Sequence, residues 1–467
     1  MNTARNISRS RLLRIRQSAG FLATVVVVSC VYFALSSEQV SRIEAQEKTN
    51  KTTGPLLTAA AAPAPTYTVF GYPELGMHCM NQDFSEICIL PPYNNVRAQV
   101  IQRGEEPRII TSGVNVLYSI PGNTKSINKT NFWDYAPQLF GVHLQPNIGL
   151  TGNGLTGKMA ATTNQDWLAT GIPLTPVNDQ MQTNPFQLGH IRVTNNAGSL
   201  LAETDAVVPV SWEISCNLCH NTPGISVATD ILRKHDKLHA TTLEKHKPVL
   251  CASCHADPAL GTKGVKGVKA FSHAMHGSHA SRMGPLTGAA ILPNVPAALN
   301  AALPNVPELK AAASAVASDF SQLFQLNTSV QLKNVCYACH PGVKTECQRD
   351  VHLSKGIVCS NCHGDMAAVG KVTRRPWVDE PTCGQCHTKI NPKFQYEEPG
   401  KLFKDSKGHG GVFCASCHGP QHAVGPATTA PDNVQAILHQ GHAGTINTCT
   451  VCHTKQPEDP FFHSRDN

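Results

Sequence analysis

The chain has 467 residues, which is room for two or three domains, and its formal charge is +7. Five positive charges lie near the N-terminus, at Arg5, Arg9, Arg11, Arg14 and Arg16, so the rest of the chain is near +2. Such a small excess does not indicate a nucleic-acid-binding surface. Fourteen of the 18 cysteines fall in one repeated pattern, so a disulfide framework does not organise the chain.

Residues 1–45 are predicted to direct export. The arginines precede an uncharged stretch, Gln17 to Ser37, whose apolar centre runs from Phe21 to Leu35. This order is typical of a secretory signal peptide. The stretch is also long enough to remain as a membrane anchor, and the residues up to Cys30 are similar to a lipidation signal. All three interpretations place the rest of the chain outside the cytoplasmic membrane, as a periplasmic, membrane-anchored, or cell-surface or extracellular protein.

Residues 46–66 are rich in Thr, Ala and Pro and predict an extended linker. Residues 67–212 then predict a β-rich domain. Short β-branched runs at 96–101, 113–120, 190–195 and 206–215 are separated by Asn, Gly and Pro. We expect a β-sandwich-like or barrel domain of about 145 residues. It carries none of the repeated motifs, so we expect it to dock or orient the rest of the chain and to perform no chemistry.

One segment of this domain, residues 72–94, is unusually rich in metal-ligand and thiol side chains. His78, Cys79, Asp83, Glu86 and Cys88 fall within eleven positions. Three interpretations remain open. Cys79 and Cys88 can close a disulfide loop, His78 can be a metal ligand, or the residues can simply pack.

Seven Cys-x-x-Cys-His motifs occupy residues 213–467. Two cysteines three apart can form thioethers to one haem, and the histidine that follows lies under the iron as its proximal ligand. We therefore expect seven covalently attached haem c groups. Zinc is the main alternative, because two Cys-x-x-Cys pairs can bind one zinc ion. Seven such pairs would leave one without a partner, and zinc binding does not explain the histidine after every pair. The motifs are Cys216, Cys219 and His220; Cys251, Cys254 and His255; Cys336, Cys339 and His340; Cys359, Cys362 and His363; Cys383, Cys386 and His387; Cys414, Cys417 and His418; and Cys449, Cys452 and His453.

The motif region is predicted to be built around its cofactors. Motifs 1 and 2 are separated from motifs 3 to 7 by a helical insertion at about 284–332, which we expect to serve in packing. About 36 residues per motif are too few for a separate apolar core at each one. The haems would form the core themselves, wrapped by short helices and coil. The predicted class is therefore α+β, with a β-sandwich-like domain followed by a multihaem region.

Each iron needs a sixth ligand, and the motif region has twelve spare histidines but only Met275, Met283 and Met366 as thioether alternatives. We therefore expect two histidines at most irons, and low reduction potentials. The stronger candidates for the distal position are His239, His276, His279, His352, His409, His422 and His442. The weaker candidates are His235, His246, His273, His439 and His463, together with His78.

The stretch 336–370, CYACHPGVKTECQRDVHLSKGIVCSNCHGDMAAVG, resembles the multihaem c-type cytochromes of metal-reducing bacteria. The settings of His409, His422 and His442 and the segment 72–94 are similar to that family too. The resemblance covers most of residues 67–467. It implies an electron-transfer protein whose partners are other redox proteins.

Two other functions remain open. The chain can be a subunit of a cytochrome filament, with copies of itself as partners. It can also be a multihaem reductase of nitrite, hydroxylamine or a sulfur oxyanion. Every motif ends in His rather than Lys, and the spare histidines leave no iron short of a ligand. Both features favour an electron carrier over an enzyme. Cys347 is assigned no role.

Overall fold

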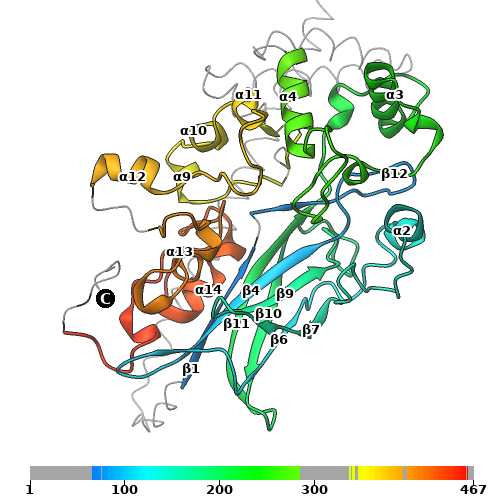
Figure 1. Cartoon of the computed structure of the whole chain (residues 1–467). Helices are drawn as coiled ribbons and strands as arrows, with labels where there is room; N and C mark the ends of the chain where they lie inside the picture. The colour runs from blue at the N-terminus through cyan, green and yellow to red at the C-terminus, as the bar shows by residue number, and fades with distance from the viewer. Residues whose placement is uncertain are drawn as a thin grey trace, which may run out of the picture. The chain divides into compact units, whose positions relative to one another are not determined.

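The computed structural model describes residues 66–283, 336–392 and 397–460, except residues 75, 338, 342–344 and 459 (Figure 1). These residues all belong to one compact unit. The predicted export segment, nearly all of the linker and the helical insertion lie outside them. Within the described ranges, no helix combines the length and the apolar character needed to cross a bilayer.

The fold mixes sheets with short helices, in agreement with the predicted α+β class. The first sheet has β1 at one edge and β8 at the other, and every neighbouring pair in it is antiparallel. Its strands are β1 (Tyr67–Pro73), β4 (Asn94–Gln102), β9 (Trp167–Ile172) and β8 (Ala160–Ala161), with β5 (Arg108–Ile110) paired to β4.

The second sheet runs in the order β2, β11, β10, β6, β7 and is antiparallel except where β2 meets β11. A separate short parallel pair joins the β region to the segment just before motif 2. The strands are β2 (His78–Cys79), β11 (Leu200–Ser211), β10 (Phe186–Thr194), β6 (Asn115–Ser119) and β7 (Thr156–Lys158), and the separate pair is β3 (Ile87–Cys88) with β12 (Val249–Leu250).

Both sheets contribute to one apolar core, which includes Val96 from the first sheet and Val208 from the second. Helix α2 (Phe132–Phe140) adds Phe132 to the same core. Gly71 of β1 allows the sheets to approach closely, because a Cβ atom there would lie 2.3 Å from Cδ1 of Ile191. Successive side chains of a strand point to opposite faces of its sheet, so every second residue of a strand fills the space between the two sheets.

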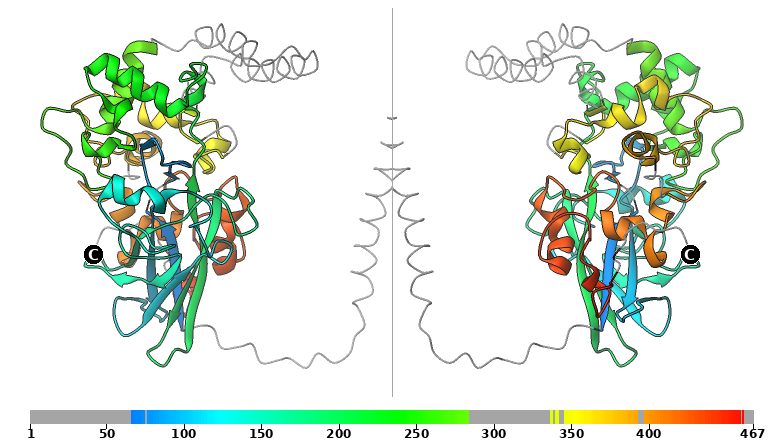
Figure 2. Two further views of the ribbon diagram at one scale, coloured as in Figure 1. Left: turned by 90° about the vertical axis from the view of Figure 1, so that its right-hand side faces the viewer. Right: turned by 90° about the vertical axis from the view of Figure 1, so that its left-hand side faces the viewer.

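The region after residue 212 is built from short helices that lie above and beside the sheets, as Figures 1 and 2 show. The motif residues form short α-helices or 3₁₀ turns. The α-helices are α3 (Val227–His239), α4 (Phe271–Met283), α9 (Val351–Ser354), α10 (Cys359–His363), α11 (Met366–Val369), α12 (Gly384–Ile390), α13 (Cys414–His418) and α14 (Ala430–Gln440). The 3₁₀ turns are η1 (Cys216–Leu218), η2 (Leu243–Lys245), η3 (Cys251–Ser253), η4 (Phe403–Asp405), η5 (His409–Gly411) and η6 (Cys449–Val451).

Few apolar side chains are buried in this second region. Among its described residues they are Leu232, Ala252, Val358, Phe413, Ala415, Ala423 and Val451. The β region, of smaller described length, buries several times as many. An apolar core of this size does not by itself offset the conformational entropy lost on folding.

Residues of strands β1 and β4 contact the last two motifs, 6 and 7. The side-chain oxygen of Gln99 on β4 accepts hydrogen bonds from Phe413 N at 3.0 Å and Ser416 Oγ at 3.1 Å. Phe70 and Ile101 pack against Val451 of motif 7. The β region thus forms part of the surroundings of these motifs.

A buried ion pair joins three segments distant in sequence. Arg349, with no exposed side-chain surface, contacts both carboxylate oxygens of Asp432 at 2.5 and 2.9 Å. It also donates to the carbonyl oxygen of Gly76 at 3.2 Å and lies over the ring of Phe186. Because Arg349 is surrounded by partners, removing it would leave the Asp432 carboxylate buried and unpaired.

We predict that Arg349→Met lowers the free energy of unfolding by about 3–5 kcal/mol, the usual cost of breaking a buried pair. Arg375→Met is the matched control. Arg375 also pairs with an aspartate, Asp379, at 2.6 Å, but its side chain is 72% exposed, so its loss should cost less than about 1 kcal/mol. Denaturant unfolding followed by circular dichroism measures both. Equal effects of the two substitutions would contradict a structural role for Arg349.

Candidate functional site

Among the residues that the structure describes, six motif histidines each face the ring of a histidine from another segment. The six ring-centre distances fall in a narrow range, although the partners come from different elements. The pairs are His220 with His279 at 6.4 Å, His255 with His235 at 6.4 Å, His340 with His276 at 5.9 Å, His363 with His422 at 6.2 Å, His387 with His352 at 6.1 Å and His453 with His409 at 6.1 Å.

This separation suits one metal ion between two imidazoles. A bond from a metal to an imidazole nitrogen is about 2 Å long, so two such bonds in line place the ring centres about 6 Å apart. Ordinary aromatic contacts also occur at such distances. The orientation of the ring nitrogens is therefore the more specific test.

In six of these twelve rings Nδ1 hydrogen bonds to an oxygen atom, and in a seventh, His220, it lies 3.4 Å from one without forming a hydrogen bond, which leaves Nε2 as the nitrogen for a metal. This is the usual arrangement around a metal-bound histidine, because the second bond fixes the tautomer and the ring orientation. The Nδ1–oxygen contacts are His255 with Lys269 O at 2.7 Å, His453 with Glu105 O at 2.7 Å, His276 with Ser272 O at 2.8 Å, His279 with Met275 O at 2.6 Å, His352 with Asp350 Oδ2 at 3.0 Å, His235 with Thr241 Oγ1 at 3.0 Å and His220 with Asp230 Oδ2 at 3.4 Å.

Helix α4 supplies the facing histidine to two motifs. His276 faces motif 3 and His279, three residues later, faces motif 1. The helix is fixed by a close backbone contact, since a Cβ atom on Gly370 would lie 2.3 Å from the nitrogen of Gly277. The short distance between His276 and His279 along the helix brings motifs 1 and 3 together.

Burial keeps several of these imidazoles neutral, the form that binds a metal. Desolvation, together with the nearby His276 and His363, lowers the pKa of His340 to about 4. Desolvation likewise lowers the pKa of His422 to about 4. His352 differs, because its hydrogen bond to Asp350 raises its pKa.

Contacts between thiols link the motifs in space. Burial raises the pKa of Cys339 in motif 3 to about 11, and Cys216 and Cys219 of motif 1 add to the rise. Cys336 of motif 3 hydrogen bonds to Cys359 of motif 4. Burial raises the pKa of Cys362, Cys383 and Cys417, and a cysteine of the next motif also raises it, namely Cys386, Cys414 and Cys452 respectively, so these cysteines lie near one another.

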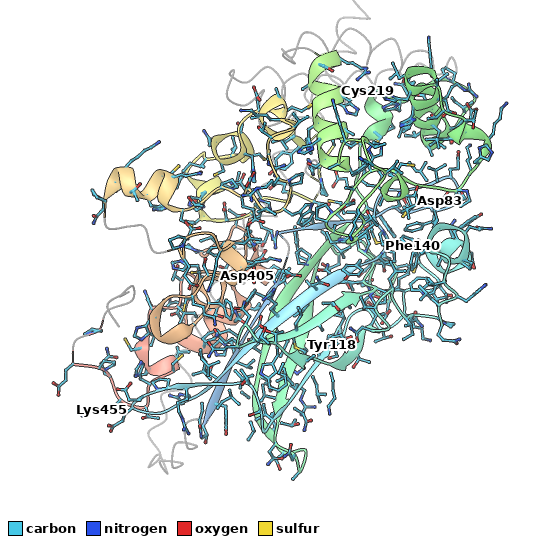
Figure 3. The ribbon with its side chains drawn as sticks, in the orientation of Figure 1. Asp83, Tyr118, Phe140, Cys219, Asp405 and Lys455 are labelled. Carbon is cyan, nitrogen blue, oxygen red and sulfur yellow. The ribbon has the colours of Figure 1, made fainter. Side chains whose placement is uncertain are left out.

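Helix α3 adds the remaining link, between motifs 1 and 2. Its Asp230 lies beside His220 of motif 1, and its His235 faces His255 of motif 2. The motifs therefore follow one another in the order 2, 1, 3, 4, 5, 6, 7. Figure 3 labels Cys219 of motif 1 at the upper right, near α3 and α4, and Lys455, just beyond motif 7, at the lower left.

Five of the seven stronger distal candidates, His276, His279, His352, His409 and His422, each face a motif histidine. At motif 2 the facing ring belongs to His235, a weaker candidate, while His239 packs on His235 at 4.8 Å. His442 is exposed, and its Nδ1 lies 3.0 Å from Ala443 O. At motif 6, Nδ1 of His418 lies 3.4 Å from Thr445 Oγ1.

In three other distal candidates Nε2, rather than Nδ1, contacts a backbone oxygen, so these rings are oriented differently from the paired ones. These contacts are His78 with Pro91 O at 2.7 Å, His273 with Arg374 O at 2.6 Å and His439 with Val69 O at 2.9 Å. His246 is exposed with Nδ1 on Thr242 O, and His463 lies outside the described residues. Asp230 and Asp350, which hold ring nitrogens, were not among the candidates, although an aspartate two residues before His352 is a recognisable signal.

The interpretation that Cys79 and Cys88 form a disulfide is wrong. Both cysteines are free. Cys79 pairs with Ser211 of β11, whereas Cys88 pairs with Leu250 of β12. The two strands join different partners, which holds the thiols apart.

In the part of the chain that the structure describes, no group of three or more His, Cys, Asp or Glu side chains surrounds a common metal position. The candidate centres are instead pairs of imidazoles beside pairs of thiols. This donor set fits haem c, which brings four ring nitrogens of its own and takes two axial ligands and two thioethers from the protein.

No protein-family model, curated protein or solved structure matches this chain. The function must therefore be inferred from the chain's own residues.

We predict that, in the protein with its haems attached, His235→Met raises the reduction potential of one haem by on the order of 0.1 V, because a thioether replaces an imidazole. His239→Met, four residues away on the same helix, should leave every potential unchanged. A spectroscopic redox titration of both variants makes the comparison. A shift caused by His239→Met alone would contradict the pairing of His235 with His255.

Proposed function

We propose that this chain is an exported heptahaem c-type cytochrome that transfers electrons along a row of haems. One observation carries the proposal. Six motif histidines face a second histidine at 5.9–6.4 Å, and oxygen contacts at most of the Nδ1 atoms leave Nε2 free for iron.

The two cysteines of each motif would hold one haem by thioether bonds, and the motif histidine would hold its iron from one side. Haem supplies reversible one-electron chemistry, at a potential set largely by its axial ligands. The chain's own residues orient the imidazoles. Glu105 and Lys269 do this with backbone oxygens, and Asp350 does it with a carboxylate.

The scarcity of buried apolar side chains after residue 212 supports the same proposal. Seven of them, spread over the described part of this region, do not make a core. Haems packed against one another would supply the missing apolar surface. We infer that residues 67–212 form a β-sandwich-like scaffold for this row, because β1 and β4 contact motifs 6 and 7.

An electron carrier is favoured over a reductase. A reductase needs an iron with an open position, and at six motifs a second imidazole faces that position. The order 2, 1, 3, 4, 5, 6, 7 would let electrons enter at one end of the row and leave at the other. Export is proposed because residues 1–45 have the pattern of an export signal and bacteria attach haem c outside the cytoplasmic membrane.

We predict seven covalent haems per chain, one for each motif. A pyridine haemochrome assay against protein mass, on protein made in a host with a cytochrome c maturation system, measures the number. Five or fewer would contradict the proposal. In a host without that system the protein should be colourless and poorly folded, because the described part of its second region buries few apolar side chains.

We also predict that the oxidised protein is dominated by low-spin iron, because two imidazoles give a strong ligand field at each paired motif. Electron paramagnetic resonance measures the spin state. A major high-spin signal that changes on adding cyanide or nitrite would instead support a reductase.

A further inference from the structure

A loop of residues 262–271 wraps tightly around motif 2. Val265 N donates to Cys254 O at 2.8 Å, and Phe271 N donates to Ala256 O at 2.9 Å. Gly264 makes the close approach possible, because it has a positive φ of 62° and a Cβ atom there would lie 2.3 Å from the nitrogen of Ala256. The carbonyl oxygen of Lys269 accepts from Nδ1 of His255. The loop is therefore held rigidly beside one candidate haem.

The outer surface of this loop is basic with an apolar centre. Lys263, Lys266 and Lys269 are spaced three residues apart and all are exposed. Val265 and Val268 lie between them with 50% and 40% of their surface exposed. Among the described residues, no carboxylate forms an ion pair with any of the three lysines. An apolar centre with a charged rim is the usual composition of a protein–protein interface.

The loop lies at one end of the row of motifs. Motif 2 is terminal in that row, and the exposed Lys237 of α3 and Lys245 of η2 add positive charge to the same end. The other end is mixed in charge, because the exposed residues near motif 7 include Glu105 and Glu106 as well as Arg108 and Lys455. The holoprotein would be mildly acidic overall, since each haem brings two propionates to a chain near +2. A local basic surface on such a molecule attracts negatively charged partners selectively.

We propose that the loop of Lys263, Lys266 and Lys269, the lysine loop, is the docking surface for a small acidic redox protein that exchanges electrons at motif 2. This rests on the proposed function, because the partner's redox centre would exchange with the haem of that motif. The lysines steer the acidic face of the partner, and Val265 and Val268 provide the contact that excludes water. The rigid backbone then fixes the distance between the two redox centres.

The test uses the full chain with its haems and a reduced plant-type [2Fe–2S] ferredoxin as the acidic probe, whose potential of about −400 mV makes it a reductant. Stopped-flow absorbance gives the rate of haem reduction at low and high salt. The K263Q/K266Q/K269Q variant should react about tenfold more slowly at low salt, with a weaker salt dependence. K263R/K266R/K269R, which keeps the charges, should restore the rate.

The matched control is K125Q/K158Q/R192Q, which removes the same charge from exposed positions of the β region. It should react like the unmodified protein. Equal rates and equal salt dependence for the two glutamine variants would overturn the proposal, because the lysines would then only be solvated or pair with the propionates of their own haem.

Haem content and spin state are measured first on every variant, so that failure of the proposed function is seen separately. If the chain carried no haem, binding of oxidised ferredoxin would still test the docking surface by nuclear magnetic resonance shifts on the ferredoxin. Shifts that persist unchanged in K263Q/K266Q/K269Q would overturn the proposal in that case too.

Discussion

Pairs of imidazole rings from distant segments lie 5.9–6.4 Å apart at six motifs, and most of the described part of the second region is arranged around these pairs. An iron held by both rings of a pair, as we propose, would impose this separation. His422 comes from 59 positions beyond His363, yet the rings lie 6.2 Å apart. His276 reaches His340 across a comparably long stretch. A region with seven described buried apolar side chains has few other means of joining such distant segments. Iron bound by both rings would be the cross-link that makes these contacts persist.

The same constraint explains the secondary structure around the motifs. The motif residues need only one turn to place two thiols and an imidazole on one side, so they form single turns such as η3 and α13. Helices α3 and α4 have 13 residues each, and each contacts two motifs. On α4, His276 and His279 lie about one turn apart on the same face, which suits two neighbouring centres. The order of the motifs in space differs from their order in the chain only among motifs 1 to 3, which are the motifs that α3 and α4 contact.

Local patterns made the motifs, the histidine surplus and the strand-rich first region predictable from the sequence. The histidine that faces each motif histidine was harder to predict, because its position depends on contacts between distant segments. His235 and His239 share a helix face, and only the position of motif 2 decides that His235 faces His255. The roles of Glu105 and Lys269 had no signal at all, because their backbone oxygens hold the rings and any residue type supplies one. The disulfide between Cys79 and Cys88 looked reasonable from spacing, and strand pairing separated them.

Anomalous X-ray diffraction at the iron absorption edge, from crystals of the full chain with its cofactors, tests the central claim most directly. The account predicts seven iron positions, one beside each motif histidine, and at each of the six described histidine pairs the iron lies midway between the two rings. It also predicts that successive irons follow the motif order 2, 1, 3, 4, 5, 6, 7. Zinc in place of iron, or irons bonded to the motif histidines with the facing histidines turned away, would contradict it.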